Sequence, residues 1–456
     1  MESRCWRWLI ACCAFGTLLP ARQVDAILFV IGDQHSAYAR SAQLVAQVDR
    51  VKASNPGVPV AILIDGDSFE QGNVVARRSE GAADLALFAA LARRGPTILN
   101  LGNHEPEFHD VPETVKRVGA TGVTVIGNLA DRSTGSLFAP ASTRLSLGRA
   151  ELVVAGVTTD ILAQYRAAIR PTLDLSAPAT WAREKFPELL AAAPLRIVLS
   201  HAGLRLDRGM FPFIPEGTLI AGAHDHAQFV ERMGQTVYFH SGSWNSHVSI
   251  VRLQLSAEGP TWTVEQQAIR DADPADAELA AVITEIQRTH LTAADLVVVG
   301  QLPGALTRDD SARYVVRAVR RATNADAAFI GNTTFGDALP AGDVTQVDLN
   351  SCVRFDGTLW TAELTGTRLR KLMSRANQGP DTPFAERDGE FSFADGPLNI
   401  VADRMYRIAT NDWGVQNRSR YFSATGADEI SFTEIPTLRL KAVTAAALAA
   451  ETPSAP

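Results

Sequence analysis

The chain has 456 residues and a formal net charge of −7, with 46% hydrophobic and 20% charged residues. A chain of this length exceeds what one hydrophobic core usually organises, so two domains are expected. The balance of apolar and charged residues is ordinary for a globular protein, and it excludes a disordered chain or a multi-spanning membrane protein. The acidic charge gives no support to a nucleic-acid polymer as partner, because such binding needs a basic face. An anionic substrate would have to be held by local positive charge, from metal ions or a few arginines.

The N-terminus has the pattern of a secretory signal peptide. Arg4 and Arg7 precede an apolar run over residues 8–19, and the small residue Ala26 ends the pattern. The run is shorter than the roughly 20 residues that a transmembrane helix needs. We therefore expect a signal segment over residues 1–26, no other membrane span, and export to the periplasm or the extracellular space. Cleavage after Ala21, an uncleaved N-terminal anchor and a lipoprotein remain as alternatives.

Short β-branched runs alternate with amphipathic stretches through the first half of the chain. The runs end in glycine or polar residues, which predicts buried strands, while apolar residues three and four apart in the other stretches predict helices. The predicted strands cover residues 27–31, 60–64, 97–101, 123–126, 152–157, 196–199, 218–221 and 237–240. The predicted helices cover residues 41–52 and 82–94, and the predicted closing hairpin covers 248–255 and 261–267. This alternation indicates an α/β layered domain over residues 27–270.

The sequence changes character after residue 270. A polar helix is expected to about His290, within a linker region over residues 271–300. A smaller, mixed α/β domain is expected over residues 301–445. Its predicted elements are a helix at 312–322, a strand at 327–330 and a turn at 339–343. Residues 446–456 are rich in alanine and proline, which predicts a frayed tail.

Histidine, aspartate and asparagine residues follow five of the predicted strands, at their carboxyl ends. In open α/β sheets this edge is where ligands bind. The candidate metal ligands are Asp33, His35, Asp67, Asn103, His201, His224 and His226. Alternate residues of an extended segment point the same way, so Asp33 with His35, and His224 with His226, are expected to converge on a metal. A mixed oxygen and nitrogen ligand set suits Mn, Fe or Zn better than Ca or Mg.

The order of these motifs resembles that of the calcineurin-like metallophosphoesterase superfamily. The signature there is D-x-H, then G-D, then G-N-H-D/E, then a lone histidine, then G-H-x-H, and only Ala223, in place of a glycine, departs from it here. Residues 339–345, 364–366 and 410–412 resemble recurring segments of the C-terminal domain in the 5′-nucleotidase branch. The resemblance covers nearly the whole chain beyond the signal segment. It implies a four-layer α/β/β/α metallophosphoesterase domain followed by a smaller mixed α/β substrate domain.

The resemblance also implies two divalent metal ions and assigns each ligand to one of them. The implied sets are Asp33, His35 and His226 for one ion and Asn103, His201 and His224 for the other, with Asp67 as the bridge. A carboxylate shared by two divalent ions about 3.5–4 Å apart is the usual arrangement for in-line phosphoryl displacement.

His104 is implied to sit over the leaving group, where an imidazolium can donate to the developing oxyanion. Its orienting partner in the resembling family is an aspartate three residues further on. Here that position is Glu107, which keeps the carboxylate and adds one methylene group. We therefore expect the interaction between His104 and Glu107 to be retained with altered geometry.

The second domain departs from the substrate-binding segments of the resembling family. Asp337 occupies the place of an arginine, which leaves Arg354 as the best candidate for an anion contact. Phe335 and Trp413 are candidates for a surface that stacks on a base, although aromatic residues at such spacings also form cores. His240, near the expected rim of the site, is a candidate phosphate contact or a packed strand histidine. Nucleoside specificity is left open by these departures.

Together these features predict a two-metal hydrolase of phosphate esters, acting by attack of a metal-bound water or hydroxide with His104 assisting. Nucleotides or related small phosphorylated metabolites are the expected substrates, which would place the enzyme in nucleotide catabolism outside the cytoplasm. No obligate protein partner is evident. One alternative is a hydrolase of cyclic phosphodiester or sulfur-linked substrates on the same fold, and another is a non-catalytic exported metal-binding protein.

Overall fold

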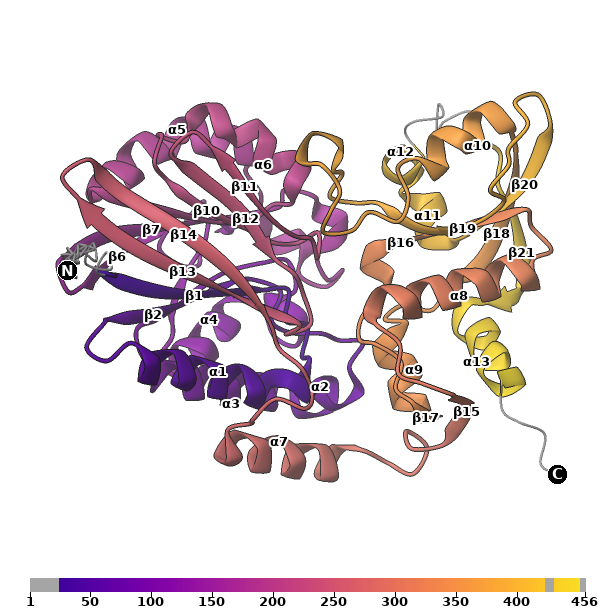
Figure 1. Cartoon of the computed structure of the whole chain (residues 1–456), viewed down its shortest axis with the longest axis horizontal. Helices are drawn as coiled ribbons and strands as arrows, with labels where there is room; N and C mark the ends of the chain where they lie inside the picture. Colours follow the sequence, from indigo (N-terminus) through magenta and orange to yellow (C-terminus); the bar gives the residue numbers. More distant parts are fainter. Residues whose placement is uncertain (1–23, 423–429, 452–456) are drawn as a thin grey trace, which may run out of the picture.

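The structure is a computed structural model that describes residues 24–422 and 430–451. Residues 1–23, which make up most of the predicted signal segment, lie outside the described residues, as do residues 452–456 of the predicted tail. Figure 1 shows the two domains side by side, with the chain passing from the first to the second through the helix α7.

The first domain contains a six-stranded sheet in the order β14-β13-β1-β2-β3-β4. Its strands are β1 (Ala26–Gly32), β2 (Val60–Asp65), β3 (Thr97–Asn100), β4 (Thr124–Ile126), β13 (His247–Ser256) and β14 (Gly259–Ala268). β1 to β4 run parallel, whereas β13 pairs antiparallel with both β1 and β14. The predicted strands and the closing hairpin are confirmed in this sheet.

A second six-stranded sheet has the order β11-β12-β10-β9-β7-β6. Its strands are β6 (Ser142–Leu147), β7 (Ala150–Thr158), β9 (Leu195–His201), β10 (Leu219–Gly222), β11 (Gln228–Met233) and β12 (Thr236–Ser241). The four inner strands run parallel, and the two edge strands are antiparallel to their neighbours.

The two sheets pack face to face and helices cover their outer faces. Because side chains alternate along a strand, one set from each sheet can fill the space between them, as Leu28 and Leu63 do with Ile197 and Leu199. The helices packed on the first sheet are α1 (Ser41–Ser54), α2 (Val74–Ser79), α3 (Ala82–Ala92), α4 (Val111–Gly119) and α7 (Ala277–His290). The helices packed on the second sheet are α5 (Pro178–Leu189) and α6 (Leu204–Met210). A short ribbon of β5 (Ala130–Asp131) and β8 (Leu173–Asp174) completes the domain. The four-layer α/β/β/α architecture is thereby confirmed.

The second domain is built on a five-stranded sheet in the order β19-β16-β20-β18-β21. Its strands are β16 (Ala327–Gly331), β18 (Thr358–Thr365), β19 (Ser392–Asp395), β20 (Met405–Asn411) and β21 (Thr433–Arg439), beside the separate pair β15 (Val298–Leu302) and β17 (Gly342–Thr345). The helices are α8 (Arg308–Ala322), α9 (Gln346–Cys352), α10 (Gly366–Met373), α11 (Asp412–Gln416), α12 (Arg418–Tyr421) and α13 (Leu440–Glu451). α8, α9 and α13 pack on one face of the sheet and α10 on the other, so the domain has its own core on each side. This confirms the smaller mixed α/β domain.

The prediction of a frayed tail over residues 446–456 is wrong for its described part. Residues up to Glu451 belong to α13, and the side chain of Leu448 is fully buried. The alanine-rich composition that suggested fraying also has the highest helix propensity, and packing against α8 and β15 holds the helix in place.

Within the residues that the structure describes, no helix has both the length and the apolar content needed to cross a membrane.

Candidate active site

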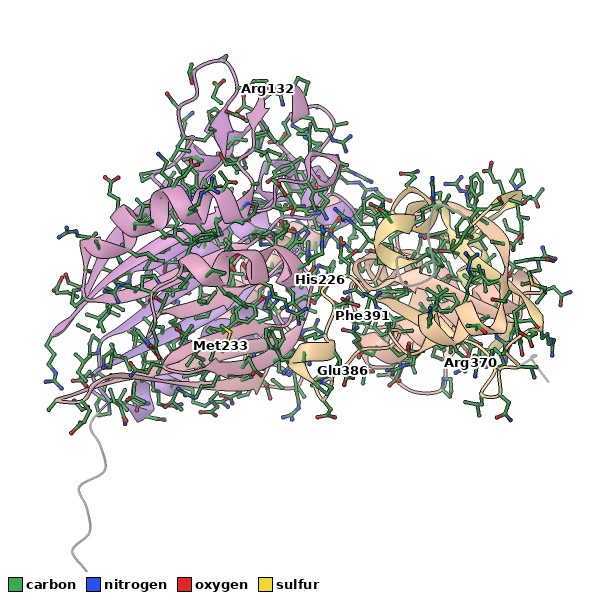
Figure 2. All side chains as sticks on the ribbon, turned by 90° about the horizontal axis from the view of Figure 1, so that it is seen from above. Arg132, His226, Met233, Arg370, Glu386 and Phe391 are labelled. Atoms are coloured by element: carbon green, nitrogen blue, oxygen red, sulfur yellow. The ribbon has the colours of Figure 1, made fainter. Side chains whose placement is uncertain are left out.

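The predicted metal ligands lie together at the edge where the carboxyl ends of both sheets of the first domain meet. Parallel pairing aligns the ends of β1, β2 and β3 in one sheet, and of β9 and β10 in the other. The residues that follow each strand therefore lie together at this edge of the sheets. Figure 2 shows His226 at this edge, at the junction with the second domain.

The first group consists of Asp33, His35 and His226. One ligand-type atom from each lies within 4.8 Å of the other two, and all three residues are buried. The Nε2 atoms of His35 and His226 are 2.9 Å apart, so both rings turn the same nitrogen toward one point.

The second group consists of Asp67, His201 and His224, again within 4.8 Å of one another. Nε2 of His201 lies 3.1 Å from Oδ2 of Asp67. Nδ1 of His201 donates to the backbone carbonyl of Asp65 at 2.7 Å, which orients the ring with Nε2 toward Asp67. Because Oδ2 of Asp67 is also 3.9 Å from Nε2 of His35, its carboxylate lies between the two groups.

Buried atoms without hydrogen-bond partners point into this space. Within the described residues these include Oδ2 of Asp33, Oδ1 of Asn103, Nε2 of His201 and Nδ1 of His224. An unpartnered buried polar atom is costly, and four of them on converging side chains fit a bound cation. Asn103 is held by its other amide atom, since Nδ2 donates to the carbonyl of Gln164 at 3.3 Å.

The backbone at the strand ends adopts the left-handed conformation at five of the predicted ligands. The φ angles are 49° at Asp33, 47° at His35, 51° at Asp67, 80° at His224 and 56° at His226. Non-glycine residues rarely adopt this conformation, and such strain concentrates at functional sites. Convergence of the side chains therefore comes from tight turns rather than from the extended segments that the sequence suggested.

Burial and mutual repulsion disturb the titration of these groups when no cation balances them. Burial, and to a smaller extent the Asp67 carboxylate, raises the pKa of Asp33 to about 7 against the lowering effect of His201. Burial, together with the nearby Arg354 guanidinium, lowers the pKa of His35 to about 3. A cluster of carboxylates and neutral imidazoles is the form that binds divalent cations.

The predicted pair of His104 and Glu107 is present, with Nδ1 of His104 2.5 Å from Oε1 of Glu107. The short helix that carries Glu107 spans Glu105–Glu107 and follows His104 directly. The backbone N–H of His104 donates to Oδ1 of Asp67 at 2.7 Å, which ties the pair to the ligand cluster. Burial would lower the pKa of His104, but the carboxylates of Asp67 and Glu107 raise it to about 9. The Glu107 side chain, which is one methylene longer than aspartate, therefore still places its carboxylate beside the His104 ring.

A cavity of about 460 Å³ opens over this cluster, between the two domains. Its floor carries Asp67, Asn103, His104, Glu107, His224 and His226. The second domain contributes Arg354, Phe355 and Trp413 to the wall, and the first contributes Arg166 and Arg170. Phe355, with 46% of its surface exposed, was missed by sequence reasoning, although it stands beside Arg354 in the sequence.

Phe335 and His240, each a candidate substrate contact or a packed residue, are packed residues in the structure. Phe335 is buried in the core of the second domain, where it packs edge-on against Phe393. His240 is buried beneath the second sheet, where its Nε2 lies 2.6 Å from the Tyr238 hydroxyl and its ring stacks on Phe229. Neither side chain lines the cavity, because both lie on strands or turns whose side chains face a core.

Trp413 and Arg354 do line the cavity, but Arg354 has a partner that the sequence did not suggest. Its Nε donates to Oε2 of Glu70 at 2.7 Å, and both side chains are buried. The two residues are 284 positions apart, so no local pattern relates them.

Comparison with known proteins identifies both halves of the chain. Residues 28–228 match the calcineurin-like phosphoesterase family, and residues 267–426 match the 5′-nucleotidase C-terminal domain. Calcineurin-like phosphoesterases use divalent metal ions, and members of these families act on small phosphorylated substrates. A search of curated protein sequences found no match.

Solved structures with the same two-domain fold include three enzymes. The 5′-nucleotidase precursor from Thermus thermophilus is 17% identical, with a TM-score of 0.63 and coverage of 93% of this chain and 96% of that one. The sulfate thiohydrolase SoxB, also from Thermus thermophilus, is 15% identical, with a TM-score of 0.65 and coverage of 94% and 95%. The 5′-nucleotidase from Candida albicans is 11% identical, with a TM-score of 0.62 and coverage of 94% and 98%. At these identities the likeness establishes the fold.

The matched families, the shared fold and the clustered ligand atoms agree with one another. The chain belongs to the calcineurin-like phosphoesterases that carry a 5′-nucleotidase C-terminal domain, and it is a metal-dependent hydrolytic enzyme acting on phosphoesters.

Proposed function

We propose that this enzyme hydrolyses phosphate esters of nucleotides or related small metabolites, with two divalent ions held at the junction of its domains. The observation that carries the proposal is the placement of two ligand groups, joined by Asp67, on the floor of a cavity with aromatic side chains on its wall.

In this proposal the ligand groups hold one ion each. The sets are Asp33, His35 and His226 for one ion and Asn103, His201 and His224 for the other, with Asp67 shared. The mixture of oxygen and imidazole nitrogen donors suits Mn, Zn or Fe. When bound, such ions supply Lewis acidity toward the phosphoryl oxygens and lower the pKa of a water molecule.

His104 is proposed to give a proton to the departing alcohol oxygen. Glu107 faces Nδ1 of the ring, so Nε2 is the atom left to donate toward the substrate. The hydrogen bond from the His104 backbone to Asp67 fixes the distance between this ring and the phosphoryl site. General acid assistance of this kind contributes roughly 10²–10⁴-fold to rate.

The cavity wall supports a substrate with a flat apolar group. Phe355 and Trp413 both line the cavity from the second domain, and aromatic faces of this kind stack on nucleobases. Arg166 and Arg170 line the wall from the first domain and supply positive charge for an anionic substrate. Nε of Arg166 is buried and has no hydrogen-bond partner within the described residues.

We also infer that the enzyme acts outside the cytoplasm. The support is the sequence pattern over residues 1–26 alone, with two arginines, an apolar run and a small-residue end. N-terminal sequencing of the protein purified from a periplasmic or culture fraction tests this. A mature chain that begins near residue 22 or 27 agrees with it, whereas an intact N-terminus in the cytoplasmic fraction contradicts it.

The proposed reaction is tested with a substrate panel. The panel contains nucleoside monophosphates, non-aromatic phosphomonoesters, cyclic nucleotides and a sulfur-linked sulfate ester, assayed with the wild type, Asp67→Asn and His104→Asn. A matched control is His109→Asn, because His109 contacts Glu80 outside the cavity. We expect turnover of phosphomonoesters that falls at least 100-fold in Asp67→Asn and in His104→Asn and is unchanged in His109→Asn.

The same panel separates the alternatives. Preferred turnover of a cyclic or sulfur-linked substrate would replace the proposed substrate class while leaving the metal centre in place. Full activity in Asp67→Asn would place the chemistry elsewhere. Metal binding without turnover of any member would favour a non-catalytic metal-binding protein.

A further inference from the structure

A buried ion pair crosses from the second domain to the metal centre of the first. Arg354 follows α9, and Glu70 follows the turn that carries Asp67. Nε of Arg354 donates to Oε2 of Glu70 at 2.7 Å, and Nη2 donates to the same oxygen. The side chains of Arg354 and Glu70 are 3% and 1% exposed, so water does not screen the pair.

Both residues of this ion pair also contact His35, a predicted metal ligand. Oε2 of Glu70 lies 3.4 Å from Nδ1 of His35, and Nη2 of Arg354 lies 3.1 Å from the same nitrogen. The other ring nitrogen of His35 faces His226 in the ligand group. Glu70 and Arg354 therefore contact the side of the ring that points away from the ligand group. In metal sites a carboxylate at this position fixes the orientation of a histidine ligand.

Both oxygens of the Glu70 carboxylate have partners in the structure. Its Oε1 accepts a hydrogen bond from the backbone N–H of Gly72 at 2.7 Å, and its Oε2 faces Arg354 and His35. Both carboxylate oxygens thus have partners, and an oxygen of Glu70 also lies within 4.8 Å of nitrogen atoms of His35 and His104.

Arg354 is itself held in a defined position. Nη1 donates to the carbonyl of Thr333 at 2.9 Å. Its guanidinium lies 4.9 Å from the ring centre of Phe355 and 5.4 Å from that of Trp244. Trp244 stacks on His35, with ring centres 5.1 Å apart and planes at 23°. The guanidinium and the indole thus pack around the same histidine.

We propose that Arg354 is a positioning residue of the metal centre, which acts through Glu70 to hold the His35 ring with Nε2 toward the Asp33, His35 and His226 group. The second domain then forms part of the support of the metal site as well as part of the substrate cavity. The inference rests on the proposed role of His35 as a metal ligand. It differs from a direct contact between Arg354 and the substrate anion, because it predicts an effect in the absence of substrate.

The experiment titrates Mn²⁺ alone into metal-free full-length protein and follows binding by calorimetry and by electron paramagnetic resonance. The variants are Arg354→Met, Arg354→Lys, Glu70→Gln and the double variant Arg354→Met with Glu70→Gln. The matched control is Asp337→Asn, which breaks another ion pair between the domains, from Arg40 to Asp337 at 2.7 Å, without touching His35.

We expect Arg354→Met and Glu70→Gln each to weaken Mn²⁺ binding at one of two sites by about 10–100-fold. The double variant should lose little more than either single variant, because both act on the same ring. Arg354→Lys should fall between wild type and Arg354→Met, since lysine keeps the charge but not the planar fork. It also serves as the readout if Arg354→Met does not fold. Asp337→Asn should bind Mn²⁺ within about twofold of wild type.

Two results would overturn the inference. Wild-type affinity at both sites in folded Arg354→Met or Arg354→Lys, together with a raised KM for the phosphate ester, would make Arg354 a substrate contact. Equal loss of Mn²⁺ in Asp337→Asn would assign the effect to loosened domains rather than to the His35 ring. Failure of the wild type itself to bind two ions would instead contradict the proposed function.

Discussion

At the scale of single residues, the ligand cluster combines strain with burial. Left-handed backbone at Asp33, His35, Asp67, His224 and His226 costs on the order of 1–3 kcal/mol each. Such a conformation persists only where the surroundings determine it, and here burial and the backbone hydrogen bonds from Asp33 to Gly66 and from His35 to Asp67 do so. The candidate ligands could be recognised in the sequence because each stands at a strand end. Their backbone geometry did not, because a D-x-H or H-x-H triplet has the same letters in an extended segment and in a tight turn.

The two phenylalanines Phe335 and Phe355 make a testable contrast. Phe355→Ala should raise KM for a nucleotide by about 5–150-fold, equivalent to the roughly 1–3 kcal/mol of a base stacked on an aromatic ring, and leave thermal stability nearly unchanged. Phe335→Ala should lower the free energy of unfolding by about 3–5 kcal/mol, because it leaves a cavity in the core of the second domain. Steady-state kinetics and denaturant unfolding of both variants measure this. A KM effect of the same size on a non-aromatic phosphomonoester would argue against stacking.

The sequence could not distinguish these two residues. Both are aromatic side chains outside the predicted helix and strand of the second domain. Phe335 is directed inward because its backbone pairs with that of Val353 next to the sheet. The two alternatives for His240 stayed open for a similar reason, since the contacts with Tyr238 and Phe229 that bury it depend on the pairing of β11 with β12.

Asp84 on α3 gives a prediction about pH and stability. Burial raises the pKa of Asp84 to about 8, against the lowering effect of the hydroxyls of Tyr38 and Ser36. Between the unfolded value of 3.8 and this folded value, the native chain keeps a proton that the unfolded chain releases. The stability from Asp84 is therefore fully present below about pH 4 and is lost as pH rises toward 8.

Asp84→Asn removes that loss, because asparagine has no proton to release. The free energy of unfolding of the variant minus that of the wild type should increase from pH 5 to pH 8 in urea titrations at fixed metal concentration. A difference that stays constant or decreases over this range would contradict the assignment.

At the scale of elements, α13 shows where composition misleads. Alanine-rich sequence near a chain end suggested fraying, but Leu448 is buried and the helix lies close to Gly300 of β15. A Cβ added at Gly300 would stand 2.3 Å from the backbone carbon of Leu448, which is closer than atoms can pack. The helix was not predicted because its stability comes from tertiary contact with an element about 150 residues away.

Gly300→Ala should therefore destabilise the second domain by about 1–3 kcal/mol through overpacking. The matched control is Gly304→Ala, since nothing lies within 4 Å of a Cβ built there. Thermal unfolding of the two variants compares them directly. Equal midpoints for both would show that α13 does not pack on β15 in this way.

At the scale of the whole molecule, the site belongs to both domains. The four-layer domain, its helices and most strands were predictable, because periodicity and strand-end residues are local signals. The junction was not, because the contacts of Arg354 with Glu70, of Arg40 with Asp337, and of Asn332 with the carbonyl of Asp225 depend on how two folded domains meet. The replacement of an arginine by Asp337, seen in the sequence as a loss of substrate contact, is a contact between domains in the structure.

The central claim is that one edge of the first domain holds two divalent ions with Asp67 between them. The most direct measurement is the metal content of the purified chain after reconstitution with Mn or Zn, by mass spectrometry, for wild type, Asp67→Asn and His109→Asn. We expect close to two ions per chain in the wild type and in His109→Asn, and clearly fewer in Asp67→Asn. One ion or fewer in the wild type, or two in Asp67→Asn with unchanged affinity, would contradict it.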